Sequence, residues 1–235
     1  FLAANIRKSN PDTQVIIFEK AAKVLAKVKV SGGGRCNLTN SFAEIKDLVH
    51  AYPRGHRLMK KLFKTFDYED AYQWFEDRGV RLTTQEDQCV FPVSQDSESI
   101  ILCLKREAQK NGAEIRTRHE VSRIEHLEDG TFRLSFASAD IAPCCVDRVA
   151  ITSGGAPLPK DLLYLETLGH ETEAPVPSLY TFNIKNEAAH QLMGIVVEEA
   201  TAWIPGTKFK SQGALLFTHW GMSGPAILKL SSYAA

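Results

Sequence analysis

Three consecutive glycines, Gly32, Gly33 and Gly34, most restrict what this chain can fold into. Without a Cβ, glycine adopts positive φ readily and lets a ligand approach the backbone closely. Amide groups in such a turn can form an anion-binding nest, and the next residue, Arg35, carries a fork of donors that matches a phosphate or a carbonyl. The block Ser31–Asn40 therefore predicts a cradle for a phosphate or a cofactor. A flexible glycine turn beside a solvated lysine face is the alternative interpretation.

The residues that follow the glycines support the same prediction. Asn37, Thr39 and Asn40 offer short donors and acceptors that suit the polar edge of a heterocycle. The block is not a P-loop, because Gly-Lys-Ser/Thr is absent. Cys36 has no assignable histidine partner, so a small buried thiol is the simpler interpretation than a nucleophile.

Two apolar runs predict strands on either side of this block. Val15–Phe18 predicts a strand buried on both faces that ends at Glu19. In a dinucleotide-binding fold, an acid at this place accepts hydrogen bonds from the ribose; by itself Glu19 also fits an exposed strand-end carboxylate. Val146–Ile151 predicts a second buried strand, which leads directly into Thr152-Ser153-Gly154-Gly155. The small residues Gly154 and Gly155 would let a ligand pass over the carboxyl end of this strand.

Other patterns give the remaining elements. Leu58, Leu62 and Phe66 recur at four-residue spacing, with Met59 and Phe63 beside them, and predict a helix with an apolar face. Asp67 is expected to cap the next helix. Further signals are short strands at 80–92, a helix from Ser97, a hairpin at Asp129-Gly130 and strand-like text after Ser178.

Charge and cysteine usage exclude several classes of function. Lys plus Arg equals Asp plus Glu, 28 each, so no global field favours nucleic acid or an anionic membrane, although a local basic stretch could still contact a phosphate. The five cysteines form no C-x-x-C pair, so neither a disulfide framework nor a zinc site is predicted. We expect a cytoplasmic protein with reduced cysteines that binds a small molecule, with no nucleic acid, membrane or metal.

A substrate-side site is a hypothesis for the segment from Thr218 to Pro225. His219 could exchange a proton near neutral pH, and Ser223 would stand where a helix N-terminus favours an anion. The alternative is a strand-to-helix turn, with Ser223 as N-cap and Pro225 in the first helical turn. His219 and Ser223 are thus weak catalytic candidates, and the catalytic residues are otherwise unknown.

Two long blocks, Lys27–Asn40 and Leu215–Ala226, resemble the BaiN-type NAD(P)/FAD-dependent oxidoreductases, which include aminoacetone-oxidase-like flavoproteins. Val90–Ser94 and Ile151–Gly155 continue the match, although family members usually read Ala-Thr-Gly-Gly at the latter. The resemblance implies an α/β fold: an FAD-binding, Rossmann-like domain of the two-dinucleotide-binding-domain flavoprotein type, with a β-rich inserted substrate domain. It also implies a fragment that lacks the N-terminal glycine loop and the C-terminal part. The expected domains are an incomplete FAD-binding domain at 1–156, a linker at 157–177 and the start of the β-rich domain at 178–235.

The resemblance also implies roles for individual residues. Glu19 would hold the ribose, and the backbone of Val121 would face adenine. Gly154 and Gly155 would pass beneath the cofactor. The residues expected to line the pyrophosphate and isoalloxazine, or to complete that cofactor-binding set, are Lys27, Gly32, Gly33, Gly34, Arg35, Cys36, Asn37 and Asn40.

The function that follows is FAD-dependent, two-electron hydride transfer on an unknown small organic substrate, with NAD(P)H as candidate electron donor. Two alternatives stay open. One is an FAD-binding module without redox turnover, and the other is a flavin-assisted non-redox elimination.

Overall fold

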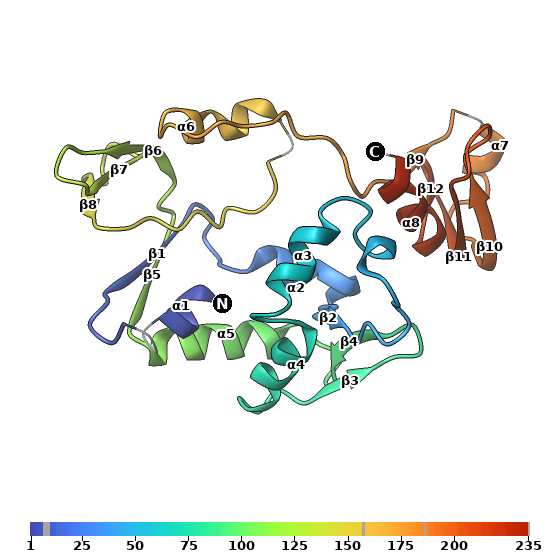
Figure 1. The fold of residues 1–235 in the computed structure, drawn as a ribbon, viewed down its shortest axis with the longest axis horizontal. Coiled ribbons are helices and arrows are strands. Elements are labelled where there is room, and N and C mark those ends of the chain that lie inside the picture. The colour runs from blue at the N-terminus through green and yellow to red at the C-terminus, as the bar shows by residue number, and fades with distance from the viewer. Residues whose placement is uncertain (7–9, 157, 186, 235) are drawn as a thin grey trace. The chain divides into compact units, whose positions relative to one another are not determined.

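The computed structural model describes residues 1–6, 10–156, 158–185 and 187–234 (Figure 1). The chain forms two compact units, Phe1–Leu48 with Arg57–Thr152 and Val49–His56 with Ser153–Ala235, and each is described by itself. Pro157, the first residue of the expected linker, lies outside the described residues. The domain boundaries drawn from the sequence stay predictions.

A parallel strand pair organises one part of the first unit. β1 (Val15–Glu19) pairs with β5 (Ala113–Thr117), and Glu19 lies opposite Thr117 at their carboxyl ends. A parallel pair needs a long crossover, which here includes helix α5 (Glu98–Lys110). The predicted strand is confirmed, but every side chain of β1 is only partly buried. The expected burial on both faces is therefore wrong within the described residues.

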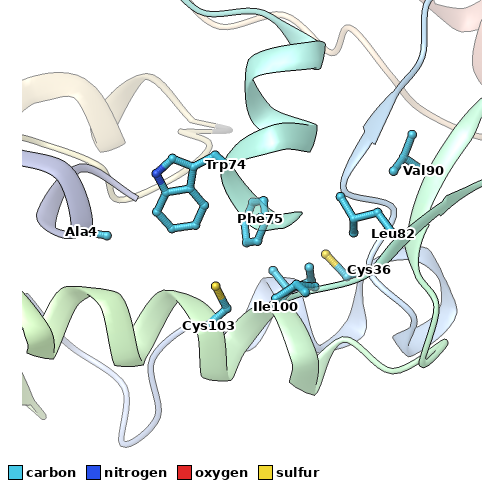
Figure 2. Packing of buried hydrophobic residues seen from close by; sticks show 9 residues of the cluster. Ala4, Cys36, Trp74, Phe75, Leu82, Val90, Ile100 and Cys103 are labelled. Atoms are coloured by element: carbon cyan, nitrogen blue, oxygen red, sulfur yellow. The ribbon is translucent and has the colours of Figure 1, made fainter. Parts of the chain in front are cut away.

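The main core of this unit lies between helices α4 and α5 and a small antiparallel sheet (Figure 2). Asp67 caps α4 (Tyr68–Glu76) as predicted: its Oδ1 accepts from the amides of Glu69 and Asp70. The sheet has the order β2-β4-β3, with β2 at Thr39–Asn40, β3 at Leu82–Thr84 and β4 at Cys89–Pro92. Buried members of the core are Ala4, Cys36, Trp74, Phe75, Val80, Leu82, Val90, Ile100 and Cys103.

A three-stranded antiparallel sheet contains the predicted hairpin at Asp129-Gly130. Its strands are β6 (Val121–His126), β7 (Phe132–Phe136) and β8 (Cys144–Val146). The predicted strand Val146–Ile151 is wrong, because β8 ends where that strand should begin. Val146 already pairs with Phe132, the first residue of β7, so the next position has no partner strand. Ile151 is 40% exposed.

The second unit contains an antiparallel sheet of order β10-β11-β12-β9 covered by helix α8 (Pro225–Ala234). Its strands are β9 (Phe182–Asn183), β10 (Val196–Trp203), β11 (Lys210–Thr218) and β12 (Gly221–Ser223). Gly224 lets the chain before α8 lie close to the backbone of β11, since a Cβ there would lie 2.7 Å from the carbonyl oxygen of Ala214. The expected β-rich character of this region is confirmed.

The remaining elements are short. They are α1 (Leu2–Asn5), α2 (Ala26–Val30), α3 (His56–Leu62), α6 (Leu163–Glu166), α7 (Glu187–His190) and the 3-10 turns η2 (Ser31–Gly34), η3 (Leu48–His50) and η4 (Pro159–Leu162). None of the helices in the described ranges combines the length and the apolar character that a membrane crossing needs.

Candidate cofactor site

The glycine block folds into a left-handed turn. Gly32, Gly33 and Gly34 have φ values of 55°, 67° and 86°, in the region that favours glycine. A Cβ on Gly32 would lie 2.6 Å from the backbone nitrogen of Asn37, whereas one on Gly33 would meet no atom within 4 Å. Gly32 therefore lets the chain fold back on itself, and Gly33 presents its backbone to open space.

Hydrogen bonds from neighbouring elements fix this turn. The amide of Cys36 donates to the carbonyl of Ser31 at 3.0 Å, which closes the turn. The amide of Leu38 donates to the carbonyl of Val90 at 2.8 Å, and the amide of Ser97 donates to the carbonyl of Gly34 at 2.9 Å. Because both sides are bonded to β4 and to the start of α5, the block is a constrained loop and not a flexible glycine turn.

Ser97 does more for the block than for its own helix. Its side chain is fully buried, and Oγ donates to the carbonyl of Lys29 at 3.0 Å. The predicted helix begins here, but Asp96 accepts the free amide of Glu98 at 2.9 Å. That hydrogen bond, followed by the one from Lys29, lowers the pKa of the Asp96 carboxyl. α5 is thereby joined to the end of α2.

Arg35 is oriented by three contacts. Nε donates to the carbonyl of Gly32 at 3.2 Å, and Nη1 donates to Oε1 of Gln95 at 3.2 Å. The guanidinium carbon stands 4.2 Å from the ring centre of Phe91, in a cation–π arrangement. A guanidinium has five N–H donors, so these described bonds leave donors that a phosphate or a carbonyl of a ligand could use.

A pocket of about 400 Å³ opens beside the block. Three of the predicted cofactor residues, Lys27, Cys36 and Asn37, line it together. Its wall is otherwise largely apolar and includes Phe1, Val28, Leu38, Phe75, Ile100 and Leu104. The arrangement suits a planar ring that has one polar edge.

Cys36 contributes packing here and not nucleophilic chemistry. Its side chain is 5% exposed and belongs to the core cluster, which Figure 2 shows beside Ile100 and Leu82. Burial raises the pKa of the Cys36 thiol, and this outweighs the opposing hydrogen bond from Ser31. The thiol therefore stays protonated near neutral pH, as the interpretation of a small buried thiol requires.

Glu19 and Val121 meet at the carboxyl ends of β1 and β5. Glu19 Oε1 accepts from the amide of Ala21 at 2.8 Å, and its backbone carbonyl accepts from the amide of His119 at 2.9 Å. Two residues after His119, Val121 opens β6 opposite Phe136. Ligands bind at this end of strands in open α/β sheets. Glu19 thus lies at the carboxyl end of the strand pair and Val121 two residues beyond its partner His119, and one carboxylate oxygen of Glu19 already has a partner.

Gly154 and Gly155 belong to the second unit and follow a segment without regular structure. Gly154 has a φ of 90°. Gly155 is exposed, and a Cβ on Gly155 would meet no atom within 4 Å. The strand that was expected to deliver them is absent from this described segment. Their approach to a cofactor therefore stays a prediction that the local fold does not assist.

The turn after β11 carries His219 but does not use Ser223 as expected. His219 packs edge-on against Trp220, with ring centres 4.3 Å apart. Ser223 is the last residue of β12 and pairs with Leu216, so its predicted role as N-cap is wrong. The amide of Leu228 donates to the carbonyl of Gly224 at 2.9 Å, which makes Gly224 the cap, with Pro225 first in the helix as predicted.

Sequence reasoning missed the residues that support the block from behind. Gln95 and Ser97 hold Arg35 and Gly34, and the apolar wall comes from Ile100 and Leu104 on α5. The helix from Ser97 was predicted, and Ile100 and Leu104 lie on the side of it that lines the pocket. No sequence signal said that this side faces the glycine block, because the contacts that join the two span about sixty positions of the chain.

Comparison with known proteins first defines the class: residues 1–161 match a family described as the HI0933-like protein Rossmann domain, and residues 176–235 match the HI0933-like protein barrel and H2TH domain. The molecule is therefore a Rossmann-like protein with a barrel/H2TH domain. This chain belongs to the HI0933-like family. That match also supports FAD as the cofactor, and the predicted fold class is confirmed.

Three curated relatives match nearly the whole chain. "Ribosomal RNA dihydrouridine synthase" of Haemophilus influenzae is 29% identical over 99% of this chain and 58% of that protein. The protein of the same name from Escherichia coli K12 is 26% identical over 94% of this chain and 55% of its own length. "3-dehydro-bile acid delta(4,6)-reductase" of Clostridium scindens is 24% identical, over 97% and 56%. The chain thus spans between 55% and 58% of these relatives, and the predicted BaiN-type family is confirmed.

Proposed function

We propose that this chain forms part of an FAD-dependent oxidoreductase that transfers a hydride. The observation that carries the proposal is the constrained left-handed turn at Gly32–Gly34, which opens beside a pocket lined by Lys27, Cys36 and Asn37. A Cβ would fill the open space at Gly33, so the residues present fit a cofactor that lies against the backbone. Bound FAD would supply the hydride chemistry.

The chain's own residues would bind and orient the cofactor. Gly33 would allow close approach of a phosphate or the ring edge, and Arg35 would donate to it. Glu19 would accept from the ribose hydroxyls with its second carboxylate oxygen, while the backbone of Val121 would face adenine. The apolar wall that includes Phe75 and Ile100 would exclude water from one side of the pocket.

We further infer that the substrate contains a carbon–carbon double bond next to a carbonyl group. The names of the relatives support this, because dihydrouridine is uridine with one ring double bond saturated, and the other relative is named as a delta(4,6)-reductase. In such a reduction a hydride adds to one alkene carbon and a proton to the other. NAD(P)H would restore the two electrons. His219 is our candidate for the proton donor on the substrate side.

A cytoplasmic location is part of this proposal. It is supported by the five cysteines, all of which are free in the structure. A small-molecule substrate is the expectation from the sequence, and the reductase named for a bile acid favours it. The expected exclusion of nucleic acid rests on the balanced net charge alone and is not part of this proposal, because two relatives are named for ribosomal RNA.

The primary test is a visible absorption spectrum of the purified full-length protein, recorded before and after anaerobic addition of NADPH. We expect flavin absorption that bleaches with NADPH and returns with air. A colourless protein that stays colourless with added FAD would overturn the proposal. Flavin that binds but is never reduced by NADH, NADPH or dithionite would favour the binding module without turnover.

Gly33→Ala tests the site itself. We expect at least tenfold weaker FAD retention, since the new Cβ enters the space that the cofactor needs. Gly79→Ala is the matched control, because Gly79 has a similar φ of 78° and also meets no atom within 4 Å, but follows α4 outside the block. Equal FAD affinity in the two variants, measured by flavin fluorescence titration, would remove the block from the cofactor site.

A further inference from the structure

One segment of the chain is strongly basic although the net charge is zero. Between Asp47 and Asp67 there is no acidic residue, while this stretch holds five lysines and arginines. Four of these, Arg57, Lys60, Lys61 and Lys64, follow the i, i+3, i+4, i+7 spacing of one helix face, with Lys64 in the turn that follows α3. We refer to these four as the basic face of α3.

All four side chains of the basic face are exposed. The ion pairs among the described residues involve Lys29, Arg78, Arg106, Arg116 and Arg123, and none involves the basic face. The first acids that follow Lys64 along the chain are Asp67, Glu69 and Asp70, of which Asp67 and Asp70 are engaged in the capping box of α4. Four neighbouring cations without a described counter-ion form a local positive field that can attract a polyanion.

The other sides of α3 determine how this face is presented. Met59 and Phe63 are partly buried, whereas Leu58 and Leu62 are 59% and 48% exposed. The predicted helix is confirmed from His56 to Leu62, but of its expected apolar residues Met59 and Phe63 are partly buried, whereas Leu58, Leu62 and Phe66 are exposed. Phe66, two positions after Lys64, is 41% exposed, and its ring packs edge-on against Phe1 with ring centres 5.4 Å apart.

Aromatic contacts connect α3 to the cofactor block. The rings of Phe42 and Phe63 lie 5.6 Å apart, and Phe42 stacks on Tyr68 at 5.0 Å. The amide of Phe42 donates to Oδ1 of Asn40, the last residue of the block, at 2.8 Å. The turn that follows α3 is thus linked through Phe63 and Phe42 to Asn40 at the end of the block.

We propose that the basic face of α3 binds the phosphate backbone of RNA. The proposal rests on the proposed function and deepens it, since it names the polymer that would present the double bond. Unpaired lysines and arginines neutralise phosphates, and an exposed ring such as Phe66 can stack on an unpaired base. Two relatives named for ribosomal RNA favour RNA over an anionic membrane, the other polyanion that a basic helix could meet.

The test compares two charge-reversed variants of the full-length protein. Lys60→Glu/Lys61→Glu changes the basic face, and Lys110→Glu/Arg133→Glu makes the same change in net charge at exposed positions on α5 and β7. The probe is a short fluorescein-labelled single-stranded RNA, titrated by fluorescence anisotropy between about 50 and 200 mM salt. We expect at least tenfold weaker binding for the first variant and less than twofold for the control. The slope of log affinity against log salt should fall by about 1–2 in the first variant.

The outcomes separate this proposal from the flavin proposal. Thermal melting and flavin absorbance on the same samples report folding and cofactor content, and Lys60→Gln/Lys61→Gln, with a smaller expected loss, replaces the first variant if it misfolds. Weaker RNA binding with unchanged flavin supports the surface. No RNA binding by the unmodified protein, equal losses in both variants, or binding to anionic vesicles but not to RNA would overturn it. Loss of flavin reduction with RNA binding intact would contradict only the proposed function.

Discussion

The glycine block at 31–40 and the pair Gly154 and Gly155, at the end of the segment 147–155, were both expected at the cofactor, yet the two regions are built very differently. The block is bonded to β4 and α5 and contributes Cys36 to the core. The second segment follows β8 without strand structure, and Ile151 to Gly155 are exposed. The difference shows that a turn can be determined by its own residues, whereas a strand also needs a partner in register.

The left-handed glycines allow the first region to be constrained locally. Only a residue without a Cβ fits at Gly32, so the glycine in the sequence predicts the turn by itself. The apolar residues of Val146–Ile151 record only a preference for burial. A preference for burial does not form a strand beyond Val146, because Val146 already pairs with Phe132, the first residue of β7, and the next residues have no partner in that strand.

Gly32→Ala should destabilise the glycine block and lower the free energy of unfolding more than the other substitutions considered below. The new Cβ would lie 2.6 Å from the Asn37 nitrogen, and φ is +55°. We expect a loss of about 2–4 kcal/mol in the free energy of unfolding, from left-handed strain of roughly 1–2 kcal/mol and the overlap with the backbone. Urea denaturation measures it.

Gly33→Ala is the control for this loss. Its φ of 67° gives a similar strain, but no atom lies within 4 Å, so about 1–2 kcal/mol is expected. Equal destabilisation by the two substitutions would mean that the block does not close on Asn37 as described.

Ser97→Ala should weaken the same region by a smaller amount. The substitution removes the fully buried Oγ of Ser97, which donates to the carbonyl of Lys29, and leaves the amide bond to Gly34 intact. Loss of such a hydrogen bond costs about 0.5–1.5 kcal/mol, and we expect that change by thermal or urea unfolding. Ser94→Ala removes an exposed hydroxyl whose bonds to Asp96 and Ser99 can be replaced by water, so it should change stability by less than about 0.5 kcal/mol. A Ser97 variant as stable as the Ser94 variant would show that the contact between α2 and α5 contributes little.

The same contrast explains how much of the molecule could be predicted. Local signals succeeded: Asp67 caps α4, Asp129-Gly130 makes the hairpin turn, and Pro225 begins α8. Each depends on hydrogen bonds or dihedral angles within a few residues. Predictions that depend on distant partners failed, such as the strand after Val146, which lacks a neighbour beyond the end of β7.

The candidate site divides along the same line. The turn at Gly32–Gly34 follows from its residues, but its support by Gln95 and Ser97 depends on a contact across about sixty positions. Ser223 failed as a cap because pairing with Leu216 keeps it in the sheet, so Gly224 precedes the helix. Periodicity predicted the helix α3 and its apolar residues, but only tertiary packing decides that Met59 is partly buried while Leu58 and Leu62 are exposed.

Gly155→Ala should have the smallest effect on stability and sharpens the comparison most. Gly155 is exposed, has no positive φ and meets no atom within 4 Å, so we expect a change within about 0.5 kcal/mol in urea denaturation. If the residue passes beneath the cofactor as the resemblance implies, FAD affinity should still fall, because a Cβ would occupy the space between backbone and ring. Lower FAD affinity at unchanged stability would place 154–155 in the cofactor site without any help from a strand. Unchanged FAD affinity would exclude Gly155 from the cofactor site. A loss above about 2 kcal/mol in the free energy of unfolding would contradict the open surroundings of Gly155, because losses of that size come from packed or strained positions.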